Sequence, residues 1–209
     1  MTDASLSHMP GPRVDIRRRP TPLPVATAVP FSFVHINKCG GTSVEVALGL
    51  QKRHATAGAM QREMGRAAWA DRFTFAIVRN PFERITSLYY YRVRSNHHGL
   101  ADRHLNVNQW IRAIWQDGSE HYNDVPLLNG PCIDWLTDAD GTVLVDHVAR
   151  LEDIDAEWRR ISQRLGIDLP LPTLNINKRP AYRDVLTPES REILEFAFAE
   201  DLSRFEYHY

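Results

Sequence analysis

The sequence predicts an α/β fold built on a parallel sheet. Two short segments, residues 31–36 and 73–78, are rich in aromatic and β-branched residues, as buried strands are. Each is followed by a polar turn and then by apolar residues at helical spacing. Strands that alternate with helices in this way favour a parallel sheet with right-handed crossovers.

Composition narrows the class of protein. The chain has 209 residues, which suggests one domain, and its 25 basic and 26 acidic residues give a net charge of −1. This balance argues against a globally basic nucleic-acid binder. Neither a membrane-spanning apolar run nor a secretory signal is evident. Two cysteines, Cys39 and Cys132, fit a reducing compartment, so we expect a cytoplasmic protein.

The first thirty residues differ from the rest. They hold six of the thirteen prolines, interspersed with arginines. Proline removes backbone donors and resists helix formation, so residues 1–30 are predicted to be a flexible tail. Such a basic arm is either simply solvated or touches an anionic partner. Residues 31–209 are predicted to form the single domain.

The first strand runs into a glycine-containing loop at residues 37–43. Gly40 and Gly41 allow the backbone to approach a ligand closely, and the amides of the following helix favour an anion. Lys38 can reach over the same anion, and hydroxyl donors follow at Thr42 and Ser43. We therefore predict a phosphate cradle. The lysine precedes the glycines, so the loop is not a Walker A sequence.

The second strand leads to a well-marked helix start. Asn80 suits the N-cap, Pro81 the first helical position, and Glu83 would complete a capping-box-like pattern. Arg79 at the strand end and Ser87 two turns into the helix are candidates to bind a second anion. Two other basic residues of this helix, Arg84 and Arg92, are interpreted as solvated charges.

The remaining elements follow from local signals. Residues 95–103 are polar and predict a loop, and residues 129–131 predict another. Helices are expected over 105–115 with Asn106 as the cap, over 153–165 up to Gly166, and from Thr187 onward. A third strand is expected over 142–148.

Two motifs resemble those of sulfotransferases that use 3′-phosphoadenosine 5′-phosphosulfate (PAPS). FVHINKCGGTS at 33–43 is similar to their 5′-phosphosulfate loop, and FAIVRNPFERITSLY at 75–89 is similar to their 3′-phosphate motif. Further stretches at 53–57, 171–182 and 199–207 resemble the Golgi-carbohydrate and bacterial branch. The resemblance covers the chain from about residue 31 and implies a three-layer sandwich with a central parallel sheet, related to P-loop kinases.

The resemblance also implies roles for individual residues. It assigns the 5′-phosphate and sulfuryl group to Lys38 and to the rest of the cradle, which consists of Cys39, Gly40, Gly41, Thr42 and Ser43. Position 39 varies among relatives, and here it carries a thiol. It assigns the 3′-phosphate to Arg79 and Ser87. In relatives, a basic residue in the C-terminal part of the chain closes over the nucleotide, and it corresponds here to Arg179 or alternatively to Lys178. An interpretation of each as a solvated charge fits the sequence equally well. The aromatic ring that stacks on adenine is left open.

The acceptor requires a general base, and histidine titrates in the right range. His54 lies in the family-like stretch 53–57 and is the candidate, with Glu63 as the alternative. In this reading catalysis rests on Lys38 and His54, the product is adenosine 3′,5′-bisphosphate, and no metal is required, because lysine and helix amides supply the positive field. The histidines at 97, 98 and 104 lack the spacing of a metal site and predict only a polar loop.

The acceptor is expected to be a hydroxyl or amine on a glycan or on a glycosylated or small polar metabolite. Residues 95–104 and 118–131 are expected to shape its pocket. No nucleic-acid or membrane partner is predicted, and oligomeric state is left open. Two alternatives stand beside this function: a P-loop-like nucleotide kinase, and a catalytically silent nucleotide-binding module on the same fold.

Overall fold

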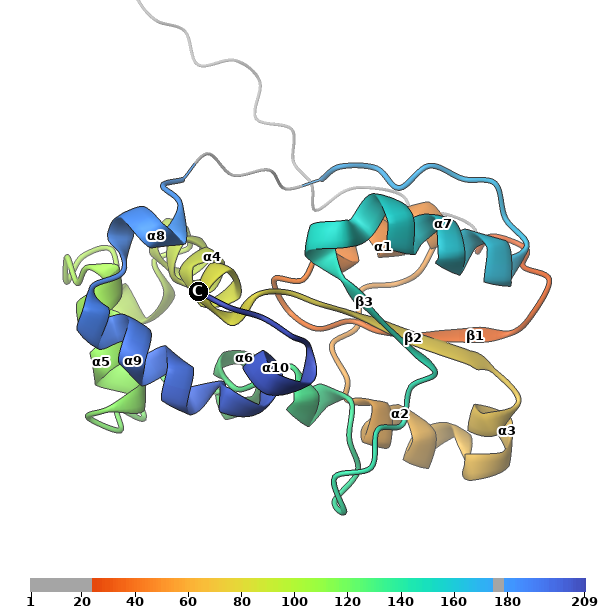
Figure 1. The fold of residues 1–209 in the computed structure, drawn as a ribbon, viewed down its shortest axis with the longest axis horizontal. Helices are drawn as coiled ribbons and strands as arrows, with labels where there is room; N and C mark the ends of the chain where they lie inside the picture. Colours follow the sequence, from red (N-terminus) through yellow and green to blue (C-terminus); the bar gives the residue numbers. More distant parts are fainter. Residues whose placement is uncertain (1–23, 175–178) are drawn as a thin grey trace, which may run out of the picture.

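The computed structural model describes residues 24–174 and 179–209. Three parallel strands form a sheet in the order β1–β2–β3, with bounds β1 (Phe31–Val34), β2 (Phe73–Val78) and β3 (His147–Arg150). Helices α1 and α7 cover one face of this sheet, and α2 and α3 lie on the other (Figure 1). The predicted α/β class with a parallel sheet between helical layers is therefore confirmed.

Helices and short 3-10 turns make up about half of the described residues outside the sheet. In chain order they are α1 (Gly41–Leu48), α2 (Ala57–Met64), α3 (Arg66–Ala70), α4 (Pro81–Arg94), η2 (His97–Gly99), α5 (Val107–Trp115), α6 (Pro126–Asn129), η3 (Ile133–Trp135), η4 (Leu151–Asp153), α7 (Ile154–Leu165), α8 (Tyr182–Val185), α9 (Pro188–Ala197) and α10 (Ala199–Arg204).

Local capping explains where several helices begin. The Asn80 side chain accepts from the Phe82 amide at 3.0 Å and starts α4, as expected. The capping-box role expected of Glu83 is wrong, because the Asn80 amide donates to Glu152 instead, at 2.8 Å. A complete capping box occurs at α5, where the Asn106 and Gln109 side chains each bond the other's backbone amide.

The third strand begins later than the sequence predicted. Residues 142–146 do not extend β3, which starts at His147. Instead Thr137 and Val143 form an isolated antiparallel bridge across a turn. The Asp138 carboxylate accepts two amides of that turn and stabilises it.

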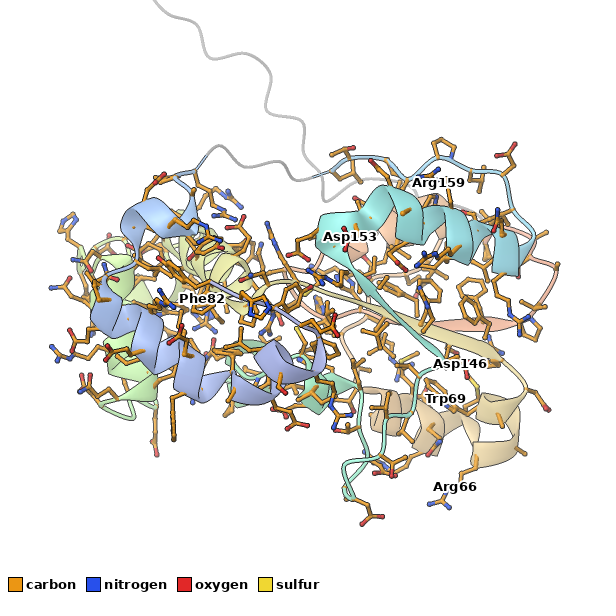
Figure 2. All side chains as sticks on the ribbon, viewed as in Figure 1. Arg66, Trp69, Phe82, Asp146, Asp153 and Arg159 are labelled. Atoms are coloured by element: carbon orange, nitrogen blue, oxygen red, sulfur yellow. The ribbon has the colours of Figure 1, made fainter. Side chains whose placement is uncertain are left out.

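Two hydrophobic cores hold the molecule together. One surrounds the sheet and includes Trp69, and the other joins α4, α5 and α9 and includes Phe82 (Figure 2). Helix α4 starts beside the sheet and runs into the second core, so it connects the two halves (Figure 1). Among the described residues, none of the helices combines the length and apolar character needed to cross a membrane.

The segment predicted as a tail lies partly within the described residues. Here the Val25 amide donates to Leu48 of α1 at 3.2 Å, and the Ala28 amide donates to Leu165 of α7 at 2.7 Å. Residues 24–30 are thus fastened to the domain. The flexibility expected of residues 1–23 concerns a part outside the described residues and stays a prediction.

Candidate functional site

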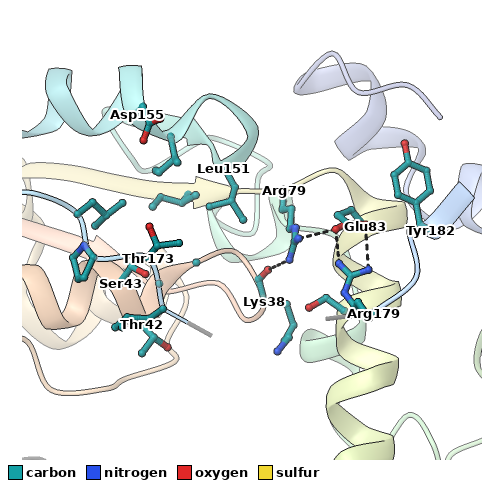
Figure 3. Close-up of a pocket in the computed structure, with 18 of the residues that line it drawn as sticks. Lys38, Thr42, Ser43, Arg79, Glu83, Leu151, Asp155, Thr173, Arg179 and Tyr182 are labelled. Atoms are coloured by element: carbon teal, nitrogen blue, oxygen red, sulfur yellow. Dashed lines mark hydrogen bonds and ion pairs between the residues drawn. The ribbon is translucent and has the colours of Figure 1, made fainter. Parts of the chain in front are cut away.

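A cavity of about 780 Å³ lies where the three strands end (Figure 3). The loop after β1, the start of α4, the turn after β3 and two segments of the C-terminal third form its walls. The residues used below that line it are Lys38, Gly40, Gly41, Thr42, Ser43, Arg79, Glu83, Ser87, Leu151, Arg179 and Tyr182, together with His35. Ligands of open α/β sheets bind at this edge.

The loop after β1 requires glycine at two positions. Gly40 has a φ of 78°, and a Cβ there would lie 2.7 Å from Cδ1 of Leu151. A Cβ on Gly41 would lie 2.1 Å from the ring of His35. Both glycines line the cavity together with Thr42 and Ser43, so the start of α1 faces it.

Lys38 stands in a strongly positive environment. Burial and, to a smaller extent, the neighbouring charges of Arg94 and Arg79 together lower its pKa to about 8. Its Nζ lies 4.5 Å from the centroid of the Tyr91 ring on α4. A bound anion would offset this repulsion, so the arrangement favours a negatively charged ligand.

Three charged side chains form one network across the cavity (Figure 3). Arg79 donates to the Lys38 carbonyl at 3.1 Å and to Glu83 Oε1 at 2.9 Å. Arg179 pairs with the same Glu83 carboxylate, and Ser87 lines the cavity two turns along α4. Arg79, Ser87 and Arg179 thus line the same cavity, whereas Lys178 lies outside the described residues.

His54 is held by a chain of hydrogen bonds next to the cavity. Its Nδ1 lies 2.9 Å from the carbonyl of His35, and the two rings are 4.3 Å apart. A carbonyl only accepts, so Nδ1 carries the proton and Nε2 keeps its lone pair. Buried Glu45 fixes this arrangement, since it accepts from His35 Nδ1 at 2.5 Å and from the Arg53 amide at 3.3 Å.

The electrostatics keep His54 in its basic form. Burial lowers its pKa, outweighing the opposite effect of the bond to the His35 carbonyl. Of the two histidines, both described by the structure, His35 lines the cavity and His54 does not.

A model of the sulfotransferase family matches residues 25–208. This chain belongs to the sulfotransferase family. Among solved structures, the sulfotransferase from Alicyclobacillus acidocaldarius is 21% identical, with a TM-score of 0.39. The match covers 72% of this chain and 58% of that one, so this chain spans little more than half of that protein's length. No curated protein matches at a significant level.

Besides His54, two other predicted residues, Cys39 and Glu63, do not line the cavity. The Cys39 side chain is buried, and its Sγ lies 3.6 Å from the Asn37 carbonyl. Glu63 is exposed and paired with Arg53, whose hydrogen bond lowers the pKa of that carboxyl. Among the described residues that line the cavity, Glu63 is absent.

The interpretation of Arg84 and Arg92 on α4 as solvated charges is wrong. Arg84 is fully buried and donates to the Gly130 carbonyl at 2.7 Å and to the Asn37 side chain at 3.0 Å. Arg92 is buried as well and donates to the Tyr122 carbonyl at 2.7 Å. Arg84 thus fixes the cradle from below, which local sequence reasoning missed because its partners are distant in the chain.

Two further residues of the cavity, Glu83 and Tyr182, were not predicted as site residues from the sequence. Glu83 was assigned only a capping role, although it joins the two arginines of the cavity. Tyr182 lines the cavity and stacks on Phe82, with ring centroids 5.9 Å apart. In the sequence, the signal for Tyr182 was its aromatic side chain directly after Pro180 and Ala181. Its distance along the chain from the other motifs did not identify it as a cavity residue.

Proposed function

We propose that this protein transfers a sulfuryl group from PAPS to a hydroxyl or amine of a polar acceptor, such as a glycan or a glycosylated or small polar metabolite. One observation carries the proposal: the cradle with Lys38 and the pair Arg79 and Ser87 converge on one cavity from successive strands. PAPS has two separate anionic groups, so it matches two separate cationic sites. Family membership supports the sulfuryl chemistry.

The residues present suit this donor. A volume of about 780 Å³ lies within the range of small-molecule sites, about 300–1,000 Å³. Lys38 and the amides and hydroxyls from Gly40 to Ser43 would hold the 5′-phosphate and sulfuryl group. Arg79 and Ser87 would hold the 3′-phosphate, with Arg179 closing over it.

In the proposed reaction an acceptor oxygen attacks sulfur while the bond from sulfur to the 5′-phosphate oxygen breaks. The bonding electron pair stays on that oxygen, and adenosine 3′,5′-bisphosphate leaves. Lys38 neutralises the charge as it develops there, and positioning by the cradle supplies much of the remaining rate gain. Nε2 of His54 takes the acceptor proton, because Nδ1 is already protonated toward His35.

The two alternatives make different demands. A nucleotide kinase would use a Walker A loop, and the lysine of this cradle precedes its glycines. A silent module would bind nucleotide without turnover, yet Lys38, Arg79 and Ser87 are all in place on the cavity wall. We retain a cytoplasmic location as part of the proposal, supported by two buried free cysteines.

The test is transfer of label from sulfur-labelled PAPS to a panel of polar hydroxyl and amine compounds. We expect a labelled product formed in a one-to-one ratio with adenosine 3′,5′-bisphosphate. The Lys38→Ala variant serves as the control for background transfer. Binding of the bisphosphate without transfer above that control, over the whole panel, would favour the silent module.

A further inference from the structure

A cluster of metal-binding side chains lies outside the cavity, at the far end of α4. It consists of His97 and His98 in the turn after α4 and Asp124 in the loop before α6. Nε2 of His97 lies 3.6 Å from Oδ2 of Asp124, and Nε2 of His98 lies 3.0 Å from the same oxygen. All three ligand atoms lie within 4.8 Å of one another.

The backbone brings two successive histidines to one point. His98 has a φ of 53° and a ψ of 32°, in the left-handed region that few residues other than glycine adopt. In this conformation its ring lies against that of His97, with centroids 4.1 Å apart and planes at 79°. Both Nε2 atoms thereby face the carboxylate of a loop that is distant in sequence.

The distances suit a tetrahedral metal ion. Zinc binds imidazole nitrogen and carboxylate oxygen at about 2.0–2.2 Å, which places two ligands of a tetrahedron about 3.3–3.6 Å apart. The observed separations of 3.0 and 3.6 Å bracket this range, so small side-chain rotations complete the site. Each of the three side chains is about one-third exposed, so an ion can enter from solvent.

Neighbouring residues hold the carboxylate in position. The other oxygen of Asp124, Oδ1, lies 3.5 Å from the guanidinium of buried Arg92, which leaves Oδ2 to the histidines. His121 stands beside the cluster, with its ring 4.9 Å from that of His98 and its Nε2 3.2 Å from the His98 carbonyl. These contacts orient the ligands in the way that outer partners do in metal sites.

We propose that His97, His98 and Asp124 bind a divalent transition-metal ion of the zinc class, with water in the fourth position. The two imidazoles select this class over magnesium or calcium, which prefer sets made only of oxygen. The metal would clamp the turn after α4 to the loop before α6. This site stands apart from the donor cavity, and its test is independent of sulfuryl transfer.

The test is calorimetric titration of ZnCl₂ into the untagged, chelator-treated full chain. We expect one saturable site with a Kd below about 10 µM, a rise in melting temperature on zinc addition, and no comparable binding of Mg²⁺. Absence of saturable zinc binding would overturn the proposal.

A matched pair of variants locates the site. His98→Asn removes a ligand, and His104→Asn changes another exposed histidine of the same loop; both positions have positive φ, which asparagine tolerates. We expect at least about tenfold weaker zinc binding in the first and no change in the second. Equal loss or equal retention in both would refute this assignment.

Asp124→Asn gives a second, independent check. It should weaken zinc binding as His98→Asn does, in a protein whose circular dichroism matches the wild type. Binding unchanged in a folded Asp124→Asn protein would also overturn the proposed ligand set.

Discussion

Lys38 combines an uncommon backbone conformation with a perturbed side chain. Its φ of 65° is in the left-handed region, where the polypeptide pays a conformational cost. The same geometry aims its carbonyl at Arg79 and sets its ammonium group over the Tyr91 ring. The residue thus contributes to the cavity through both backbone and side chain.

Substitution of Lys38 should affect turnover more than binding. We expect Lys38→Ala to lower kcat by about a hundredfold or more, because the leaving oxygen loses its counter-charge as the bond to sulfur breaks. Nucleotide affinity should fall less, since the amides and Arg79 remain. Steady-state kinetics and calorimetry separate the two effects, and a near-normal kcat would remove Lys38 from the mechanism.

The lowered pKa of Lys38 predicts an alkaline limb. The protonated form is the useful one, and burial with neighbouring cations lowers its pKa to about 8, so kcat/KM should fall as the pH rises through about 8. Lys38→Arg keeps its charge throughout this range, so its slower reaction should lack that limb. An identical alkaline limb in both proteins would assign it to another group.

His54 should control the acidic side of the profile. Its lowered pKa means that the neutral base persists below the ordinary histidine range, and activity should decline only as the pH falls further. We expect His54→Asn to reduce kcat by about 10²–10⁴-fold with little change in PAPS affinity, and to abolish the acidic limb. If that limb survives in the variant, the base is a different group and Glu63 is next to be tested.

At the scale of elements, α1 joins the glycine loop after β1 to the segment that carries His54. Its first turn presents amides to the cavity, and its buried Glu45 holds both His35 and the backbone of Arg53. One helix therefore forms part of the cavity wall at its start and holds the His54 segment through Glu45.

Loss of Glu45 should disturb catalysis through His54. Glu45→Ala leaves buried donors unpaired, so we expect a loss of about 1–3 kcal/mol in unfolding free energy and about a tenfold lower kcat. Glu45→Gln keeps an acceptor oxygen of the same shape and should recover part of both. Denaturant unfolding and kinetics measure these effects; full activity in Glu45→Ala would contradict the positioning role.

Two arginines near the start of α4 should behave oppositely. Arg79→Ala should lower by about 10–100-fold the preference for adenosine 3′,5′-bisphosphate over adenosine 5′-monophosphate, as the 3′-phosphate loses a charge-assisted bond. The unfolding free energy of Arg79→Ala should change little.

Arg84→Met should instead destabilise the fold by about 3 kcal/mol or more, since several carbonyls around Asn37 and Gly130 lose their donor.

Calorimetry and chemical denaturation on the two variants check this contrast. A preference that is unchanged in Arg79→Ala, or a stability of Arg84→Met equal to that of the wild type, would show that the assigned roles are wrong.

At the scale of the molecule, the sequence predicted what local signals determine. Strand β2 and helix α4 were placed correctly because a β-branched run, Asn80 and Pro81 mark them within a few residues. The short helices α2, α3, α6, α8 and α10 were not predicted, although the Thr56 side chain caps the start of α2 and could have marked it. The start of strand β3 was predicted too early, because Val143 pairs with Thr137 across a turn instead of extending the strand.

The site shows the same division. The order of glycines, lysine and hydroxyls in one loop predicted the cradle, and the structure places Arg79, Ser87 and Arg179 on the same cavity. Burial of Arg84, the link made by Glu83 and the meeting of His98 with Asp124 depend on contacts between distant segments. Such contacts follow from the packing of the whole chain, so the residues next to them in the sequence do not predict them.

The most direct test of the central claim, a donor site for PAPS, is calorimetric comparison of three nucleotides on the wild-type protein. Adenosine 3′,5′-bisphosphate should bind at least about tenfold more tightly than adenosine 5′-monophosphate, because Arg79 and Ser87 engage the additional phosphate. ATP with Mg²⁺ should bind more weakly than the bisphosphate. Equal affinity for bisphosphate and monophosphate, or tighter binding of ATP with Mg²⁺, would contradict the account.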